Sequence, residues 1–175
     1  MNLYRYVGNN PINRTDPSGL RFLPYHFLET FIGATIIGHG PNTAFMWALE
    51  SVMTDFEPGS QDSPLAQDTN VHGLKGLLGV NDRLQTMEEY RQGIRDAIRS
   101  STERGRYGRA CHTLQDKNAI GHKNKAYNGE LTLGHALLDL SPVETPKNIL
   151  DTAKYLWENA PPSLPRRAYQ SIFGR

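Results

Sequence analysis

Apolar residues recur with the period of an α-helix along most of the chain after residue 20. In residues 22–38, for example, the residues spaced to line one helix face are Phe27, Phe31, Ile32, Ile36 and Ile37. The same periodicity predicts helices over residues 43–56, 84–101, 109–118, 131–140 and 146–158, and a last turn or two over residues 166–175. No segment of this region alternates as a strand would, so we expect a mainly α-helical, compact bundle.

Glycine, proline and asparagine interrupt this pattern at definite places. Gly40-Pro41-Asn42 separates the first two helices, and residues 57–70 have the composition of a loop. The first twenty residues differ from the rest, with a predicted short strand over residues 3–7 and then the turn sequences Asn9-Asn10-Pro11 and Asp16-Pro17-Ser18-Gly19. Because so short a segment cannot fold alone, we divide the chain into residues 1–20 and a helical domain over residues 21–175.

The composition restricts the chemistry that the chain can perform. The formal net charge of the 175 residues is +1, so no broad electrostatic field favours nucleic acid or an anionic membrane. Cys111 is the single cysteine, which excludes a disulfide within the chain and a zinc site built from cysteines. No run reaches the roughly 18 apolar residues of a membrane span, and the N-terminus lacks the apolar core of a signal peptide. Any metal must therefore be held by His, Asp and Glu.

The candidate ligands are concentrated in residues 110–140. The pattern H-x3-D-x5-H-x12-H-x3-D supplies His112, Asp116, His122, His135 and Asp139. Residues four apart on a helix share a face, so each His-Asp pair can converge on one cation. Such ligands suit zinc and do not exclude manganese or iron. Five ligands exceed the four of a tetrahedral zinc, which predicts at least two ions bridged by the carboxylate of Asp116.

Residues 1–20 closely resemble the closing segment of the Rhs repeat-associated core, which has the form YxYxxNNPxxxxDPxGL. The matching residues are Tyr4, Tyr6, Asn9, Asn10, Pro11, Asp16, Pro17, Gly19 and Leu20. The resemblance implies that this segment is an extended remnant of the upstream Rhs β-cage, and that Asp16 assists self-cleavage between Leu20 and Arg21. It also implies a secreted toxin that a contact-dependent route such as type VI secretion delivers into the periplasm or cytoplasm of a target cell. A cognate immunity protein would neutralise it.

Residues 110–140 resemble a second family, the zinc-dependent phospholipases C with their relatives, the fungal-type single-strand nucleases. Those all-helical enzymes hold three zinc ions, and the five ligands named above match their motif one by one. The phrase HTLQD followed by GH also resembles the wording of the phospholipases. The chain departs from the family at Ile120-Gly121, where a proline usually precedes the third ligand.

This second resemblance implies further ligands upstream. The candidates are His26 or His39 for an early histidine, Asp55, Asp62 or Asp68 for an aspartate, and His72 for a second histidine. We prefer His26 and Asp55, which lies 17 residues before His72, close to the expected gap. The family's terminal tryptophan ligand is missing, although the amine of a cleaved Arg21 could replace it. We therefore expect two or three zinc ions.

Together these residues predict metal-assisted hydrolysis of a phosphodiester. Zinc lowers the pKa of bound water toward about 7. The resemblance assigns Asp55 the orientation of this water, and Asp116 shares the catalytic role as the bridging carboxylate. Lys117 and Lys123 flank the predicted site and could attract an anionic substrate. Membrane phospholipids are the leading substrate, and the alternatives are a nuclease of the same superfamily or a non-enzymatic, membrane-disrupting effector.

Overall fold

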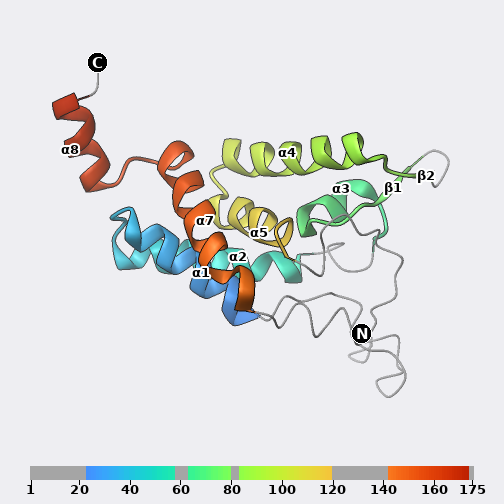
Figure 1. The fold of residues 1–175 in the computed structure, drawn as a ribbon, viewed down its shortest axis with the longest axis horizontal. Helices are drawn as coiled ribbons and strands as arrows, with labels where there is room; N and C mark the ends of the chain where they lie inside the picture. Colours follow the sequence, from blue (N-terminus) through green and yellow to red (C-terminus); the bar gives the residue numbers. More distant parts are fainter. Residues whose placement is uncertain (1–22, 58–62, 80–82, 120–141, 174–175) are drawn as a thin grey trace, which may run out of the picture.

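The computed structural model describes residues 23–57, 63–79, 83–119 and 142–173 (Figure 1). Over these residues the chain is mainly helical, which confirms the predicted fold class. The longer helices are α1 (Leu23–Ile36), α2 (Pro41–Met53), α4 (Met87–Glu103), α5 (Tyr107–Asp116), α7 (Thr145–Asn159) and α8 (Leu164–Phe173). The Rhs-like segment with its predicted strand, and the helix predicted over residues 131–140, lie outside the described residues.

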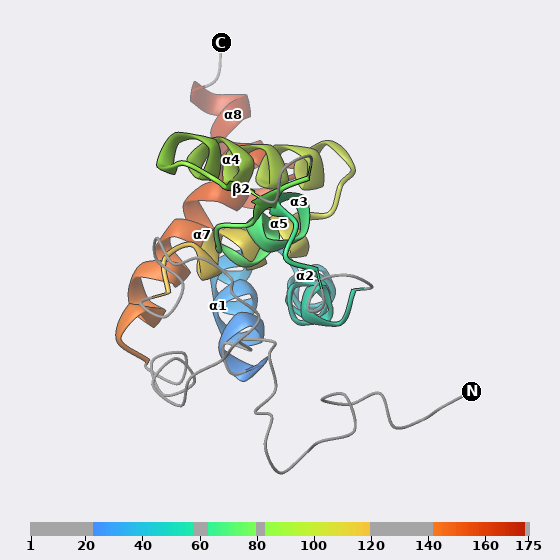
Figure 2. The same ribbon diagram turned by 90° about the vertical axis from the view of Figure 1, so that its right-hand side faces the viewer.

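Helix α5 occupies the centre of the bundle. The two views place α4 on one side of it and α1, α2 and α7 around the rest (Figures 1 and 2). Every residue of α5 from Ala110 to Asp116 is buried. A Cβ atom at Gly108 would lie 2.2 Å from the carbonyl oxygen of Trp47, so a glycine is needed for α5 to begin this close to α2. Helix α5 is thus the element against which the others are positioned.

Helices α1 and α2 form a hairpin on one side of α5. Gly38 adopts the left-handed conformation, with φ +82°, and the turn closes when its amide donates to the carbonyl oxygen of Thr35. The fully buried residues of α2 are small, namely Ala44, Ala48 and Ser51, and Trp47 packs beside them, whereas Phe45, Met46, Leu49 and Met53 are exposed. The hairpin brings the first turns of α1 and the end of α2 together at its open end, where His26 and Asp55 lie.

The segment between α2 and α4 differs from the prediction. The helix predicted to Phe56 ends as an α-helix at Met53, and a 3-10 turn, η2 (Thr54–Phe56), follows. The predicted loop over residues 57–70 is wrong at its end, where α3 (Ala66–Thr69) continues into η3 (Asn70–His72). Gly73 ends η3 with φ +64°, and a Cβ there would lie 2.6 Å from the backbone nitrogen of Lys117. Tertiary contact with the end of α5 therefore shapes this segment, and short-range periodicity could not predict it.

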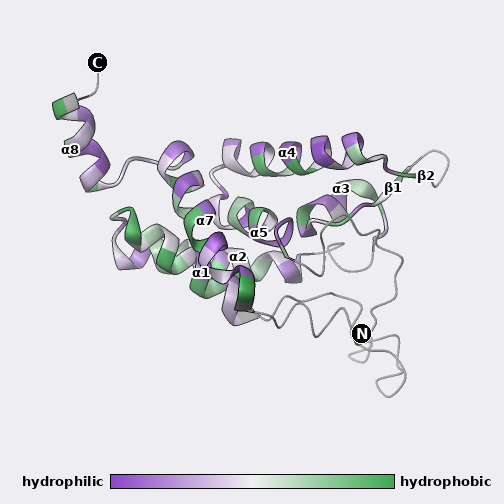
Figure 3. Ribbon diagram, in the orientation of Figure 1, coloured by the Kyte–Doolittle hydropathy of each residue, from purple (hydrophilic) through white to green (hydrophobic). Residues whose placement is uncertain are grey.

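A short antiparallel pair, β1 (Leu77–Leu78) and β2 (Arg83–Leu84), precedes α4. Each of these strands has only two residues, too few to show the alternation of apolar and polar residues by which strands are predicted from sequence. Helix α4 then begins with a capping box between Thr86 and Glu89. It presents Tyr90 and Ile94 to the interior and a hydrophilic outer face, as Figure 3 shows. A 3-10 turn, η4 (Pro142–Glu144), leads into α7, and α8 extends away from the bundle (Figure 1).

Candidate metal centre

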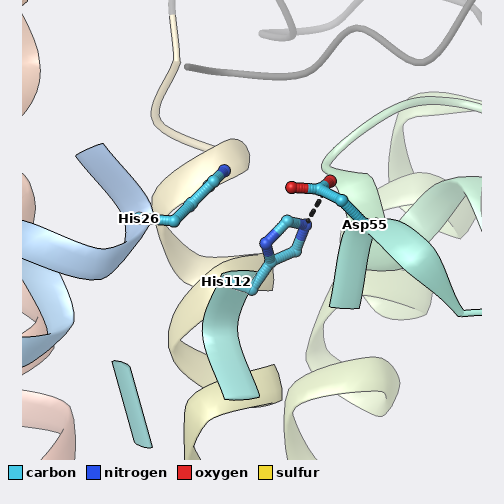
Figure 4. Close-up of side chains that lie close together, drawn as sticks. All are labelled: His26, Asp55 and His112. Atoms are coloured by element: carbon cyan, nitrogen blue, oxygen red, sulfur yellow. Dashed lines mark ion pairs between the residues drawn. The ribbon is translucent and has the colours of Figure 1, made fainter. Parts of the chain in front are cut away.

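Five of the predicted ligands meet at the open end of the α1–α2 hairpin. They are His26 of α1, Asp55 of η2, His72 of η3, and His112 and Asp116 of α5. All five residues are buried, with at most 5% of any residue exposed. His112 and Asp116 share a face because they lie four residues apart on one helix. Figure 4 shows His26, Asp55 and His112 directed toward one another from three separate elements. We call these five residues the His-Asp cluster.

Four ligand atoms of the cluster lie within a few ångströms of one another. The Nε2 atom of His112 lies 3.0 Å from His72 Nδ1, 3.1 Å from Asp116 Oδ2 and 3.5 Å from Asp55 Oδ1. The Nδ1 atom of His72 lies 3.5 Å from Asp55 Oδ1 and 3.6 Å from Asp116 Oδ2. Zinc bonds of 2.0–2.2 Å require separations of about 3.3–3.6 Å between neighbouring ligand atoms, so these five distances are close to those around a zinc ion. His72, His112 and Asp116 form one group of ligand atoms close enough to share an ion.

The two oxygens of Asp116 face different histidines. Oδ2 faces His72 and His112, whereas Oδ1 lies 3.1 Å from Nε2 of His26. A carboxylate that presents its oxygens to two separate nitrogen ligands has the arrangement of a bridge between two cations. His26, Asp55 and His112 form a second group of ligand atoms close enough to share an ion. The carboxylate of Asp116 thus lies between His26 on one side and His72 and His112 on the other.

The cluster concentrates titratable groups in a place with little water. Burial disfavours the charged form of His26, but the carboxylates of Asp116 and Asp55 outweigh it, so the pKa of this imidazole is raised above its ordinary value. For His112, burial dominates over the same two carboxylates and lowers the pKa. The rings of His26 and His112 lie 4.2 Å apart between centroids. Crowded neutral imidazoles and carboxylates are the donor set that a divalent cation prefers.

A network of arginines and glutamates holds the Asp55 segment against α5. Arg109 Nε donates to Glu57 Oε2 at 2.9 Å, and Arg106 binds Glu57 Oε1 through its terminal nitrogen. Arg106 Nε also donates to Glu50 Oε1 at 2.9 Å. We call Glu50, Glu57, Arg106 and Arg109 the arginine network. Because Glu57 follows Asp55 by two residues, this network fixes the backbone that carries the Asp55 carboxylate.

The structure separates the alternatives for the upstream ligands. His39 lies at the hairpin turn, edge-on to Trp47 with ring centroids 4.7 Å apart, and burial followed by the charge of Arg166 lowers its pKa. Asp68 lies on α3 and belongs to neither group of ligand atoms found among the described residues. Asp62 lies outside the described residues. The preferred candidates, His26 and Asp55, are therefore the ones that the fold brings together with His72.

Several predicted site residues remain untested. Lys117 directly follows α5, where burial lowers its pKa; Asp151 of α7 opposes this shift and Lys147 adds to it. The remaining residues lie outside the described residues: the ligands His122, His135 and Asp139, the substrate-binding Lys123, and the cleavage residues Asp16, Leu20 and Arg21. Their roles stay predictions.

Sequence reasoning missed two parts of the site. One is the pairing of Glu57 with the arginines. The other is Gln115, which lies between His112 and Asp116 in the sequence; its side chain is buried and contacts His26. A signal for Gln115 existed, because an uncharged amide within the buried helix of HTLQD must find hydrogen-bond partners in the protein interior. The identity of those partners could not be predicted from local spacing.

No protein-family model, curated protein or solved structure matches this chain. None of the helices within the described ranges combines the length and the apolar character needed to cross a bilayer.

Proposed function

We propose that this chain is a zinc-dependent phosphodiester hydrolase of the phospholipase C type. The observation that carries the proposal is the closeness of ligand atoms on His72, His112, Asp55 and Asp116: the five separations that include an imidazole nitrogen are 3.0–3.6 Å, close to those around a zinc ion. When bound, zinc supplies Lewis acidity and a water of lowered pKa. His26 and Asp116 Oδ1 would hold a second ion, completed by ligands predicted in residues 122–139.

The chain's own residues would divide the remaining work. Asp55, fixed by the arginine network, would orient the attacking water and accept its hydrogen bond. Asp116 would keep two cations at a constant separation, because its carboxylate faces ligands of both. Exclusion of bulk water by the buried cluster strengthens each of these electrostatic interactions.

The surface of the α1–α2 hairpin favours a phospholipid over a nucleic acid. No lysine or arginine occurs between Arg21 and Lys75, whereas nucleic-acid binding depends on cations that neutralise phosphates. The exposed face carries large apolar side chains instead, on Leu28, Ile36, Phe45, Met46, Leu49, Met53 and Phe56. Phe27 stacks on Phe31 and meets Phe45 edge-on. The hairpin that supplies His26 and Asp55 is therefore uncharged on its outer side.

The biological setting is the remaining part of the proposal. The Rhs-like residues 1–20 support a toxin released from an upstream cage by cleavage after Leu20, delivered into a target cell and neutralised by an immunity protein. Synthesis of the chain in the periplasm and in the cytoplasm of a test bacterium, with growth measured in each case, would test toxicity and its compartment.

Metal content and substrate are tested together on the purified protein. The protein is stripped with a chelator, reloaded with zinc and given phosphatidylcholine vesicles or single-stranded DNA. We expect cleavage of phosphatidylcholine that chelation abolishes and zinc restores, and loss of bound zinc and activity in His112→Ala. His39→Ala is the matched control and should retain both. Cleavage of DNA alone would replace the phospholipase by the nuclease, and absence of bound zinc would overturn the metal centre.

A further inference from the structure

Helix α8 extends away from the bundle and exposes almost its whole surface (Figures 1 and 2). Leu164, Tyr169 and Ile172 are 74%, 57% and 70% exposed, although all three have large apolar or aromatic side chains. Among residues 164–172 only Arg166 is partly buried. An isolated helix of ten residues is marginal in water, so a surface that covers these side chains would stabilise α8.

The residues of α8 divide into an apolar side and a charged side. Leu164, Ala168 and Ile172 follow one another at intervals of four residues, so they share one side of the helix. The same periodicity places Arg166 on the opposite side and Arg167 at the boundary between the two sides. The helix is therefore amphipathic, and its apolar side has no covering element among the described residues.

Contacts with the hairpin turn and with α7 hold the start of α8. Ser163 donates its hydroxyl to the carbonyl oxygen of Ile37 at 2.6 Å. Arg166 donates to the carbonyl oxygen of Ala160 at 3.1 Å, and its guanidinium carbon lies 5.7 Å from the ring centroid of Trp157. These contacts orient the helix relative to the bundle without covering its apolar side.

The positive charge of this segment is not offset by carboxylates. Glu158 is the last acidic residue in the sequence, and Arg166, Arg167 and Arg175 follow it. Within the part of the chain that the structure describes, Arg166 and Arg167 bind backbone carbonyl oxygens and no acidic side chain. The formal net charge of the whole chain is only +1, so this excess of positive charge is local.

We propose that α8 docks this chain onto an anionic phospholipid bilayer and lies in the plane of its surface. Leu164 and Ile172 enter the boundary between headgroups and acyl chains, and Arg167 binds lipid phosphates. Tyr169 lies beside them, and an aromatic ring with a hydroxyl is favoured at the level of the headgroups. An apolar side next to arginines, with no acidic residue, is the pattern of helices that bind such surfaces.

A lipid surface matches both properties of α8 better than another macromolecule does. It presents negative phosphates above an apolar layer, whereas a second copy of a chain with net charge +1 has no excess of carboxylates to meet the arginines. The exposed carboxylates of Glu88 and Asp96 on α4, for example, already face Arg95 and Arg99 of the same helix. The proposal does not depend on the metal centre, although it would bring a phospholipase to its substrate.

Sedimentation of the full chain with lipid vesicles measures this docking. Chelator is present throughout, so that a zinc enzyme cannot hydrolyse the lipid. We expect binding to vesicles of phosphatidylcholine mixed with phosphatidylglycerol, and a loss of at least about 10-fold in affinity when Leu164→Ser and Ile172→Ser are combined. Leu150→Ser, which changes a 66% exposed leucine of α7, is the matched control and should bind as the unchanged protein does.

Substitution of one arginine separates the charge from the apolar contact. Arg167→Gln should weaken binding to the mixed vesicles about five-fold and leave binding to pure phosphatidylcholine unchanged, whereas Arg167→Lys should retain the affinity of the unchanged protein. Circular dichroism checks that each variant keeps the helical fold.

Several results would overturn the proposal. They are the absence of binding to either kind of vesicle, equal binding to neutral and anionic vesicles, and equal binding by the double variant of α8 and the unchanged protein. Loss of binding in Phe45→Ser combined with Met46→Ser, but not in the α8 variant, would assign the docking to the hairpin instead. A dimer in lipid-free solution that the α8 double variant separates would assign the apolar side to a second copy. The proposed function fails on a different result, the absence of bound zinc.

Discussion

Two groups of charged side chains, one partly buried and one buried, meet helix α5 a few residues apart, and their carboxylates have different partners. In the arginine network, Glu57 accepts from both Arg106 and Arg109, and Glu50 accepts from Arg106 and from the amide of Gly108. In the His-Asp cluster, Asp55 and Asp116 face imidazoles at 3.1–3.6 Å. Asp55 and Glu57 are only two residues apart in the chain, yet one faces imidazoles and the other faces guanidiniums. The side chains that surround each carboxylate therefore make the difference.

The comparison sets a structural use of charged side chains beside the proposed metal-binding one. A guanidinium is always protonated and matches a carboxylate in shape, so the arginine network is complete without any ligand. Imidazoles are neutral or charged according to their surroundings, so the charge of three imidazoles beside two carboxylates depends on pH and on any bound cation. A divalent cation would complete that cluster. The predictions below test whether the two groups respond as differently as this argument requires.

The largest effect is expected from removal of the metal. At zinc concentrations about 1,000 times the dissociation constant, binding stabilises the folded state by about 4 kcal/mol. For a chain of this size that corresponds to a fall in Tm of about 8–16 °C on chelation, measured by thermal unfolding with zinc and with chelator. His39→Ala should show the same zinc-dependent increment, because His39 lies at the hairpin turn against Trp47, outside the ligand set. An unchanged Tm on chelation would contradict the metal centre.

The next largest effect distinguishes Glu57 from Asp55 in the metal-free protein. Glu57→Gln leaves two partly buried guanidiniums with a weaker acceptor, and we expect unfolding in urea to show a loss of about 1.5–3 kcal/mol. The partial exposure of Arg106, at 37% of its side chain, keeps the figure below that of a fully buried pair. Asp55→Asn, the matched change in the cluster, should alter the stability of the metal-free protein by no more than about 1 kcal/mol, yet abolish the zinc increment. The opposite ranking would mean that the cluster is itself a structural ion-pair network.

The sequence predicts part of the His-Asp cluster but not the arginine network, for physical reasons. The four-residue spacing of His112 and Asp116 places them on one helix face, and the long apolar periods of α1, α4 and α7 locate those helices within a few residues. The meeting of His26, Asp55 and His72 could be predicted only from a family resemblance, because the three residues lie on three elements far apart in the chain. The side chain of Gln115 donates to Thr30 and Thr152, which lie 85 and 37 residues away in the chain, and no local sequence pattern predicts such a contact. Short elements such as η3 were missed because tertiary contacts determine them.

Ionisation of Glu57 should contribute to the pH dependence of the free energy of unfolding. Burial opposes ionisation of this carboxyl, but hydrogen bonds from Arg109 and Arg106 prevail and lower its pKa below the ordinary 4.5. A lowered folded-state pKa contributes stability that is present above the unfolded value and is lost as the pH falls through the folded value. The advantage of the unchanged protein over Glu57→Gln, about 1.5–3 kcal/mol at pH 7, should therefore shrink toward zero as the pH falls below 4.5. Urea unfolding of both proteins between pH 7 and the acid limit of folding measures it, and a constant difference would exclude the ionised form as its cause.

The smallest effect on stability is expected at the exposed ion pairs of α4. They extend the comparison to charged pairs that are not buried. Arg99 meets Asp96 at 2.6 Å, a distance typical of a strong ion pair, yet the arginine side chain is 67% exposed. Water and salt screen such a pair, so we expect Arg99→Ala to change the free energy of unfolding by no more than about 0.5 kcal/mol. The same urea experiment measures it, and a rise in salt concentration should reduce the difference further. A loss as large as that of Glu57→Gln would show that burial does not distinguish the two kinds of pair, and the energetic argument for the arginine network would fail with it.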